Sequence, residues 1–442
     1  MIRSIHVLAT PFGNPFTRPD THERLVRFFG VRLRMVVLIV AVGLGGGAIG
    51  AAYMRALELV VDVLGPGEWA GWPHLIVLAG VGVVITLLVR WLGRPADVEL
   101  LVGNIHVSGT TDEGTAGDRD GRLRSLIPVS LLSVGTGGTL GPEAPLVTTT
   151  GTLATRAGKR YGLQPADVRT LAITGMAAGF SVLFGAPLGA AIFALEIPHR
   201  RGLEYYEALV PAAIGALCGY AVSTAFGGLG LEPIWSLPIV DHIDGVDLAW
   251  ALLAGVLGAA IGVLFTVFVG ALHRVADLIP AWARPTVGGI TLGLLAIATP
   301  YALTNGEFQI ESLLDSPPAV RILVIAGLAK LLGAAVALVT GWRGGFIIPL
   351  FFAGFVLGWA VAGWLPIEHE WVFVAGTMVA ANVAVTKTPF GSALVVTEMA
   401  GFPLLPTALV SSLTCLVLTS PVGLIDNQRR RFDAYEPAGD AS

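Results

Sequence analysis

A glycine-rich segment, Gly135–Val147, interrupts two apolar stretches of the chain and carries a single carboxylate, Glu143. Within a bilayer, backbone N–H and C=O groups without hydrogen-bond partners are costly, so non-helical backbone occurs there only where protein buries it or water reaches it. An ionisable group at such a point is a candidate functional residue. A helix that begins near Glu143 would offer unpaired N–H donors and the positive end of its dipole. The segment therefore predicts an anion site in which the Glu143 carboxylate competes with the anion.

The composition places this segment in a lipid bilayer. Hydrophobic residues make up 54% of the chain and charged residues 13%, and the mean hydropathy is +0.75. Soluble domains carry about 25% charged residues, so we predict an integral membrane protein. Cys218 and Cys415 both lie in apolar runs, which favours packed thiols over a disulfide. We expect no cofactor, no metal ion and no nucleic-acid partner.

Arginines flank the apolar region at both ends. Six of them occur from Arg3 to Arg34, and Arg429–Arg431 follow the last apolar run. The first 30 residues contain three prolines and no apolar core, so they do not resemble a secretory signal. The positive-inside rule predicts both termini in the cytoplasm. We therefore expect a multi-pass protein of the plasma or inner membrane with an even number of crossings.

The apolar segments form two sets separated by a more polar stretch. The predicted organisation is a cytoplasmic N-terminal segment (1–30), a first membrane repeat (31–226), a connector (227–247), a second membrane repeat (248–426) and a short cytoplasmic tail (427–442). Several pieces, among them Leu126–Val134 and Pro145–Ala154, are too short to cross a hydrocarbon core of about 30 Å, which takes about 20 residues. We expect these pieces to be half-helices that meet inside the protein.

The two halves repeat the same interruptions. The segment Ala186–Glu196 matches Thr388–Glu398, which lies 202 positions later, and Gly141–Pro145 stands about as far before Gly344–Pro349. Paired interrupted segments in two halves point to a transporter with its binding site near the membrane midplane. The pattern predicts an all-α polytopic membrane protein with two repeats and broken or re-entrant helices. The topology of the repeats is inverted if each half crosses the membrane an odd number of times.

Several motifs, in this order, resemble those of the CLC family of chloride channels and chloride/proton exchangers. They are Gly141–Pro145 for G-x-E-G-P, Gly185–Leu188 with Glu196 for A-P-L-A/G…E, a lysine at Lys330, and Gly344–Pro349 for G-G-x-F-x-P. The resemblance covers about residues 31–426. On these motifs the chain is identified as a divergent, prokaryotic-type member of the family, and we expect no CBS domains in it.

The resemblance implies a CLC-like fold with inverted repeats and a homodimer with one pore in each subunit. The segments that match the family's dimer surface are roughly Pro187–Ser223 and Pro389–Ser420. It also implies transport of chloride or another small anion. Passive conduction or uncoupled transport is favoured slightly over chloride/proton exchange, and fluoride selectivity is a further alternative.

Three departures from the family pattern affect the predicted site. The family's first anion-binding loop, G-S-G-I-P, is matched only by Val102–His106, where Gly103 or Asn104 replaces the serine. The residue that corresponds to the internal proton-transfer glutamate of many exchangers is Ile197, which favours a channel. The family's central tyrosine has no counterpart around Pro421–Ile425.

Glu143 is the predicted gate. Ionised, its carboxylate imitates an anion and fills the site; protonated or displaced, it yields to a halide. The alternative is a purely structural acid in the first turn of a helix. The predicted anion-binding residues are Gly103, Asn104, Gly141, Ala144, Gly345, Phe346 and Ile347, of which Phe346 and Ile347 would supply a second set of amides and Asn104 a side-chain amide in place of the lost hydroxyl. His106 would add a pH-sensitive charge.

The remaining membrane-depth charges have predicted roles of two kinds. Glu196 and Glu398 hold equivalent repeat positions, which favours a structural role, and Glu196 with Glu143 forms the candidate proton path. Lys330 is expected to satisfy carbonyl groups at a helix end or an acid. Arg343 and Lys387 stand at break points, where they could line a vestibule.

Two other classes of protein are compatible with an apolar chain. An intramembrane enzyme would need a nucleophile with a base, or metal ligands, at membrane depth. All eight histidines fall in tails or at segment edges, and the chain contains neither His-Glu-x-x-His nor Gly-x-Ser-x-Gly. We therefore expect no enzymatic activity. A secondary transporter of a non-anionic solute, built on the same inverted repeats, is the other alternative.

Overall fold

The structure is a computed structural model of the chain. It describes residues 20–67, 71–96, 101–103, 105, 123–199, 206–227, 235, 237, 238, 240, 242–425 and 428, with side chains from residue 33 onward. The predicted ligand Asn104 and the neighbouring His106 lie outside the described residues.

The described part of the chain is helical. Its first half contains α1 (Asp20–Leu64), α2 (Trp72–Leu92), α4 (Leu123–Gly135), α5 (Glu143–Arg160), α6 (Pro165–Phe184), α7 (Pro187–Glu196), the 3₁₀ turn η3 (Tyr206–Ala208) and α8 (Leu209–Gly227). Its second half contains α9 (Gly245–Ala276), α10 (Arg284–Ala298), η4 (Pro300–Ala302), α11 (Glu307–Asp315), α12 (Val320–Val339), α13 (Ile347–Ala362), α14 (Glu370–Thr386), α15 (Pro389–Ala400), η5 (Phe402–Leu404) and α16 (Leu405–Thr419).

Long and short apolar helices are mixed along the chain. Among the described residues, 7 helices are long and apolar enough to cross a membrane, and α4, α7, α10, α13 and α14 are apolar but shorter. The predicted multi-pass membrane protein with interrupted helices is therefore confirmed. Two details of the prediction were wrong. The helix expected to end at Ala154 continues as α5 to Arg160 through a polar last turn, and the prediction missed α11.

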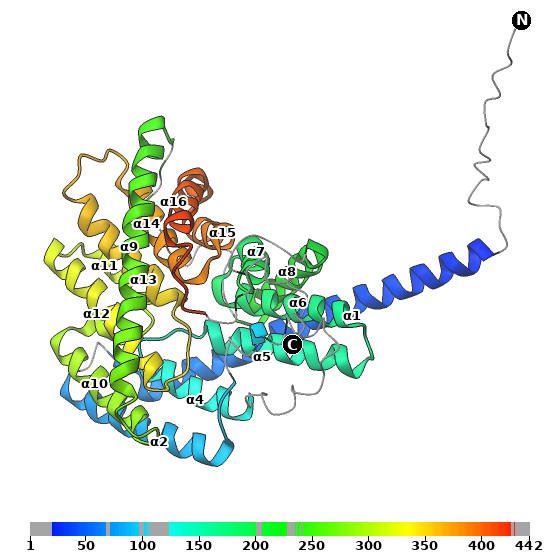
Figure 1. Cartoon of the computed structure of the whole chain (residues 1–442), viewed down its shortest axis with the longest axis horizontal. Coiled ribbons are helices and arrows are strands. Elements are labelled where there is room, and N and C mark those ends of the chain that lie inside the picture. Colours follow the sequence, from blue (N-terminus) through cyan, green and yellow to red (C-terminus); the bar gives the residue numbers. More distant parts are fainter. Residues whose placement is uncertain are drawn as a thin grey trace, which may run out of the picture.

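The two halves interlock in space. In Figure 1, α1 and α5–α8 lie on one side of the molecule and α9–α14 on the other, with α15 and α16 between them. The first-half helix α2 packs against the second-half helix α10, and α7 packs against α15. Helix α13 is apolar around its whole circumference and buried along most of its length, as expected for a helix at the centre of a bundle.

Two glutamates join the equivalent short helices α7 and α15. The Glu196 carboxylate, near the end of α7, accepts hydrogen bonds from the Phe390 N–H at 3.2 Å and the Gly391 N–H at 2.7 Å, at the start of α15. The Glu398 carboxylate, near the end of α15, accepts hydrogen bonds from the Leu188 and Gly189 N–H groups at 3.1 and 2.6 Å. Each glutamate thus caps the N-terminus of the other helix, and α7 and α15 run antiparallel.

This reciprocal arrangement relates the halves by the inverted topology that the sequence predicted. It also confirms the predicted structural role of both glutamates. Both carboxylate oxygens of Glu196 are hydrogen-bonded, since α15 presents its first amides to them. Proton transfer through Glu196 stays a prediction.

Removing either carboxylate would leave two amide groups of the opposite helix without a charged acceptor. Because a hydrogen bond to a charged group contributes about 1.5–3 kcal/mol, we expect Glu196→Ala and Glu398→Ala each to lower the melting temperature of the detergent-solubilised protein by several degrees. Glu311→Ala, which removes an exposed acid on α11, is the matched control and should leave the melting temperature unchanged. A wild-type melting temperature in Glu196→Ala would show that the caps do not hold α7 to α15.

A second polar contact joins the start of α9 to the start of α14. Asp244 and Asp247 form a capping box at the N-terminus of α9, and Oδ2 of Asp247 lies 2.9 Å from Nδ1 of His369, the residue before α14. The ring of His242 lies 5.0 Å from the ring of His369. The hydrogen bond to Asp247 raises the pKa of His369 above its ordinary value.

This raised pKa predicts a pH-dependent contribution to stability. A raised pKa in the folded state means that the contribution is fully present below the ordinary histidine value of about 6.5 and is lost as the pH rises through the folded-state pKa. We expect the melting temperature of wild-type protein to fall, relative to that of His369→Gln, as the pH rises from about 6 to about 9. His273→Gln is the control, since that side chain is 64% exposed. Parallel melting curves for wild type and His369→Gln would contradict the prediction.

Candidate anion site

The two predicted breaks meet and pair with each other. The Gly141 N–H donates to the Gly345 carbonyl at 2.8 Å, and the Gly345 N–H donates to the Gly141 carbonyl at 2.7 Å, which forms an isolated antiparallel bridge. The backbone of each interrupted segment thereby satisfies the other, as buried non-helical backbone requires. The bridge brings the first residues of α5 and α13 to one place.

Glu143 lies at this meeting point. It is the first residue of α5 and is fully buried. Its Oε1 accepts a hydrogen bond of 2.7 Å from the Ile348 N–H in the first turn of α13. The backbone N–H groups of Ile347 and of Glu143 itself also interact with the carboxylate by hydrogen bonding. Oε2 is buried and has no hydrogen-bond partner among the described residues.

The position of this carboxylate explains why glycine occurs at two positions close to it. A Cβ atom at Gly141 or at Gly345 would overlap the Glu143 carboxyl group. Glycine at both positions therefore lets the bridge pass directly against the side chain. The helix ends are otherwise uncapped, because neither Pro142 before α5 nor Phe346 before α13 provides a side-chain cap. Glu143 is thus the acidic group that meets the positive end of the α13 dipole.

The loop before α11 supports the first break from the other side. The Thr304 N–H donates to the Gly137 carbonyl at 2.9 Å, and the Thr139 hydroxyl donates to the Ala302 carbonyl. The buried Lys330 ammonium donates to the carbonyls of Leu303 and Thr304 at 2.6 and 2.9 Å. The predicted role of Lys330 in satisfying helix-end carbonyls is confirmed.

A cavity of about 1600 Å³ reaches the two helix ends. At one end it is lined by Ala144 and Pro145 of α5 and by Gly344 and Phe346 of the second break. Glu143 is not among the residues that line the cavity, although the two residues that follow it are. The cavity therefore reaches the starts of α5 and α13 but not the buried carboxylate.

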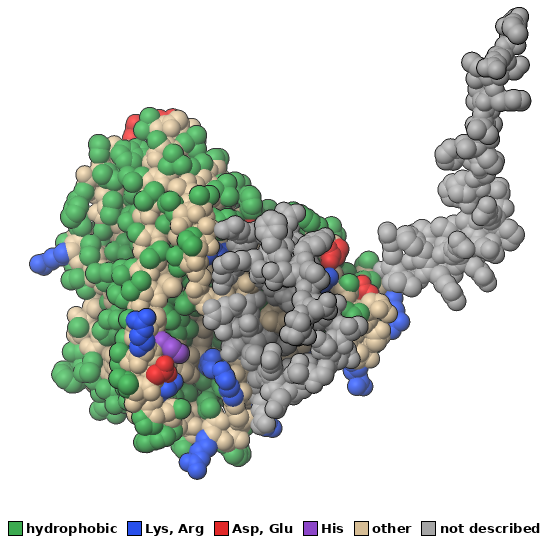
Figure 2. Space-filling view, viewed as in Figure 1, with side chains coloured by type: hydrophobic (Ala, Val, Ile, Leu, Met, Phe, Trp, Pro, Cys, Tyr) green, Lys and Arg blue, Asp and Glu red, His purple; other side chains and the backbone are tan. Residues whose placement is uncertain are grey.

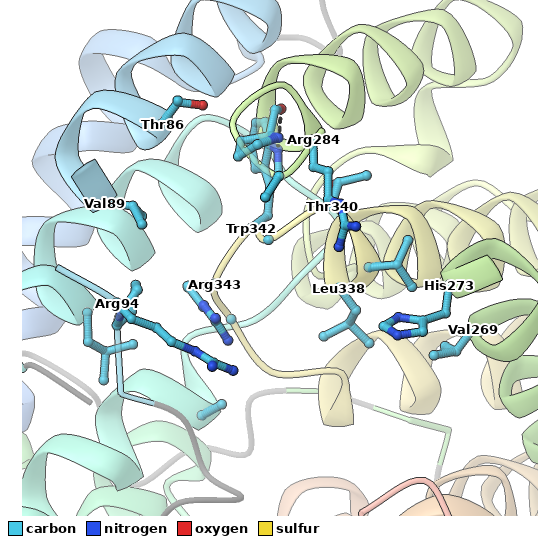
Figure 3. Close-up of a pocket in the computed structure, with 18 of the residues that line it drawn as sticks. Thr86, Val89, Arg94, Val269, His273, Arg284, Leu338, Thr340, Trp342 and Arg343 are labelled. Atoms are coloured by element: carbon cyan, nitrogen blue, oxygen red, sulfur yellow. Dashed lines mark hydrogen bonds between the residues drawn. The ribbon is translucent and has the colours of Figure 1, made fainter. Parts of the chain in front are cut away.

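The cavity wall is strongly basic. Five arginines and one histidine line it, and no Asp or Glu is found among the described lining residues; the basic residues are Arg90, Arg94, His273, Arg274, Arg284 and Arg343. Figure 3 shows Arg94, Arg343 and His273 pointing into the same space. Asp277, outside the lining, offsets part of this charge, since its carboxylate oxygens lie 3.2 Å from Arg284 and 3.8 Å from His273. A cleft with an excess of one sign of charge concentrates ions of the opposite sign, so the remaining arginines favour anions in this cavity.

The surface outside the cavity is mainly apolar. Figure 2 shows few charged side chains on the face in view, and the lysines and arginines there are scattered, several of them near the lower edge. Arg343 and Lys387 were both expected to line a vestibule, and only one of them does. Arg343 lines the cavity, whereas Lys387 does not: its buried ammonium donates to the Ala384 and Thr419 carbonyls at 2.6 and 2.7 Å.

The structure gathers most of the predicted site residues. Ala144, Phe346 and Ile347 lie at the two helix starts, and Gly141 and Gly345 lie at the bridge, where their amides pair with each other. Gly103 is half-buried in a short helical stretch. The amide of Ile348, which sequence reasoning missed, makes the shortest contact to Glu143. Its only sequence signal was its position one residue after the predicted amide donor Ile347.

Fold and site together define a class of protein: a polytopic membrane protein whose broken helices converge on an anion-compatible site beside a basic cavity. A protein-family model described as voltage gated chloride channel matches residues 122–420. The chain belongs to this family, and the resemblance to CLC proteins seen in the sequence is confirmed. The family is one of anion-transport proteins, not of enzymes.

Individual relatives agree with this assignment. A chloride/fluoride channel protein of Pseudomonas syringae pv. tomato is 24% identical over 435 residues, which cover 94% of this chain and 89% of the relative. The voltage-gated ClC-type chloride channel ClcB of Escherichia coli O81 is 28% identical over 301 residues, covering 66% and 71%.

Solved structures show the same fold. A CLC-type fluoride/proton antiporter superposes with a TM-score of 0.77 at 23% identity, over 90% of this chain and 98% of that chain. A slow cyanobacterial Cl⁻/H⁺ antiporter superposes with a TM-score of 0.74 at 19% identity, over 88% and 94%. The predicted CLC-like fold of inverted repeats is therefore confirmed.

Proposed function

We propose that this protein transports chloride, or another small anion, through the converging N-termini of α5 and α13, and that Glu143 is the gate. The observation that carries the proposal is the position of the Glu143 carboxylate. It is a negative group, fully buried, held by the first amides of α13 at the point where a basic cavity ends. The carboxylate accepts hydrogen bonds from these amides. The same donors would stabilise a dehydrated anion in its place.

Within this class, we favour passive conduction or uncoupled transport over proton exchange. Many exchangers of this family use a second carboxylate, away from the gate, to take up the proton. The candidate Glu196 is engaged through both carboxylate oxygens by amides of α15, and Ile197 follows it. Protonating Glu196 would weaken the cap that joins α7 to α15.

Chloride/proton exchange is the second candidate, because both similar solved structures described above are proton antiporters. Fluoride as the preferred ion is favoured by the names of two similar proteins, a chloride/fluoride channel protein and a fluoride/proton antiporter. A halide panel and an imposed pH gradient separate these candidates.

We also propose a homodimer with both termini in the cytoplasm. The segments that resemble the family's dimer surface expose large apolar side chains, among them Leu188 at 50%, Leu217 at 57% and Val417 at 74%. Helices of two copies could bury these side chains against each other.

The gate proposal predicts the behaviour of Glu143→Gln. Purified wild-type protein in liposomes should release chloride with a rate that depends on pH, by up to about ten-fold per pH unit across the titration of a single carboxyl group. Glu143→Gln cannot ionise, so its chloride efflux should be continuous and nearly independent of pH. The measurement is chloride efflux with an electrode, from about pH 5 to about pH 8. Glu311→Gln, on an exposed position of α11, should keep the wild-type profile.

Three outcomes bear on the proposal. A wild-type pH profile in Glu143→Gln would show that this residue is not the gate, and wild-type liposomes that release no halide would contradict anion transport itself. A reversal potential that shifts with an imposed proton gradient would establish exchange in place of passive conduction.

A further inference from the structure

One threonine in α5 differs from its neighbours. The hydroxyl groups of Thr149, Thr150 and Thr155 each donate to the backbone carbonyl four residues earlier, at 2.7, 3.1 and 2.9 Å. This is the usual bond of a threonine inside a helix. The Thr148 side chain is 1% exposed, and its hydroxyl has no hydrogen-bond partner among the described residues.

A buried hydroxyl without a partner is costly and asks for an explanation. The location of Thr148 provides one. It follows Ala144 by one helical turn, on the same face of α5, and both residues line the basic cavity. The Ser181 hydroxyl is also buried without a partner, but Ser181 does not line the cavity. Among the described residues with such a hydroxyl, Thr148 is therefore the one that belongs to the cavity wall, with its Oγ1 atom buried directly beneath the cavity surface.

The donors near this end of the cavity are limited. The N–H groups of Gly141 and Gly345 each donate to the carbonyl of the other glycine, and the Ile348 N–H donates to Glu143. Pro145 has no N–H. An anion that leaves water needs several hydrogen-bond donors. Because several backbone N–H groups here are already bonded, a side-chain hydroxyl in this wall would contribute strongly to binding the anion.

We propose that the Thr148 hydroxyl is a ligand of the transported anion at the end of the cavity and that it sets the preference among halides. The inference rests on the proposed anion transport and goes beyond it, because it assigns a ligand that the motif comparison does not. The hydroxyl supplies, from a different helix, the kind of donor that a serine would have supplied in the loop Val102–His106, which contains no serine. The basic cavity wall brings the anion to Thr148, and the hydroxyl then donates to it directly.

Thr148→Val removes the hydroxyl while keeping the shape of the side chain. Because a hydrogen bond to a charged group is worth about one factor of ten or more in affinity, we expect this variant to raise the KM for chloride efflux about ten-fold while leaving the saturated rate within about two-fold. Fluoride should be affected most and iodide least, since the smallest halide depends most on strong hydrogen bonds. Thr148→Ser should restore both the KM and the halide order.

Thr149→Val is the matched control. It makes the same change one residue along α5, at a buried hydroxyl that already bonds to the Pro145 carbonyl. It should keep the wild-type KM and halide order. Calorimetric titration of chloride into each purified protein provides a second readout, in which Thr148→Val should weaken binding by the same factor.

The outcomes separate this inference from the function on which it rests. If wild type releases halide and Thr148→Val has the KM and halide order of Thr149→Val, the Thr148 hydroxyl is not a ligand, although anion transport stands. If Thr148→Val does not yield folded protein, Thr148→Ala removes the same hydroxyl without adding bulk and is judged by the same readouts. Failure of the wild-type protein to release any halide would count against the proposed function.

Discussion

The contact between the Glu143 carboxylate and the first amides of α13 is the interaction on which the architecture depends. A buried carboxylate is stable only when hydrogen-bond donors replace its water. Here the donors belong to the other half of the chain, at Ile348. To bring these donors within reach, α5 and α13 must begin at the same point, so each half of the chain must contain a break there. The two broken segments satisfy their backbone groups through the Gly141–Gly345 bridge. Glycine at both positions leaves room for the carboxyl group.

The same pairing of helix ends with opposite charges recurs away from the site. Glu196 and Glu398 each cap the N-terminus of the helix from the other repeat, where the dipole favours a negative group. Lys330 and Lys387 place ammonium groups on carbonyls that follow or end helices, where the dipole favours a positive group. The chain has few charged side chains, and these four, within the apolar region, each lie against the end of a helix or the turn that follows it.

The sequence was informative where the chain must break an apolar pattern. Glycine and proline clusters predicted the interruptions, and an isolated acid beside one of them predicted that Glu143 lies where helix N-termini converge. The 202-residue offset predicted the relation that the Glu196 and Glu398 caps display. The sequence could not predict that the amides of Gly141 and Gly345 pair with each other, nor that Ile348 meets the carboxylate. These choices among adjacent amides depend on how two distant helices are rotated. The unsatisfied hydroxyl of Thr148 is likewise visible only once its neighbours in α5 are seen to be bonded.

The positions of the two acids decide how a proton could be coupled to the anion. Glu143 is fully buried and does not line the basic cavity, although Ala144 and Phe346 do. Glu196 is occupied by the amides of α15. A proton that enters from the cavity would have to cross a space lined by arginines, which repels cations. These positions support the proposal of an anion pathway gated by Glu143 over that of a stoichiometric exchanger.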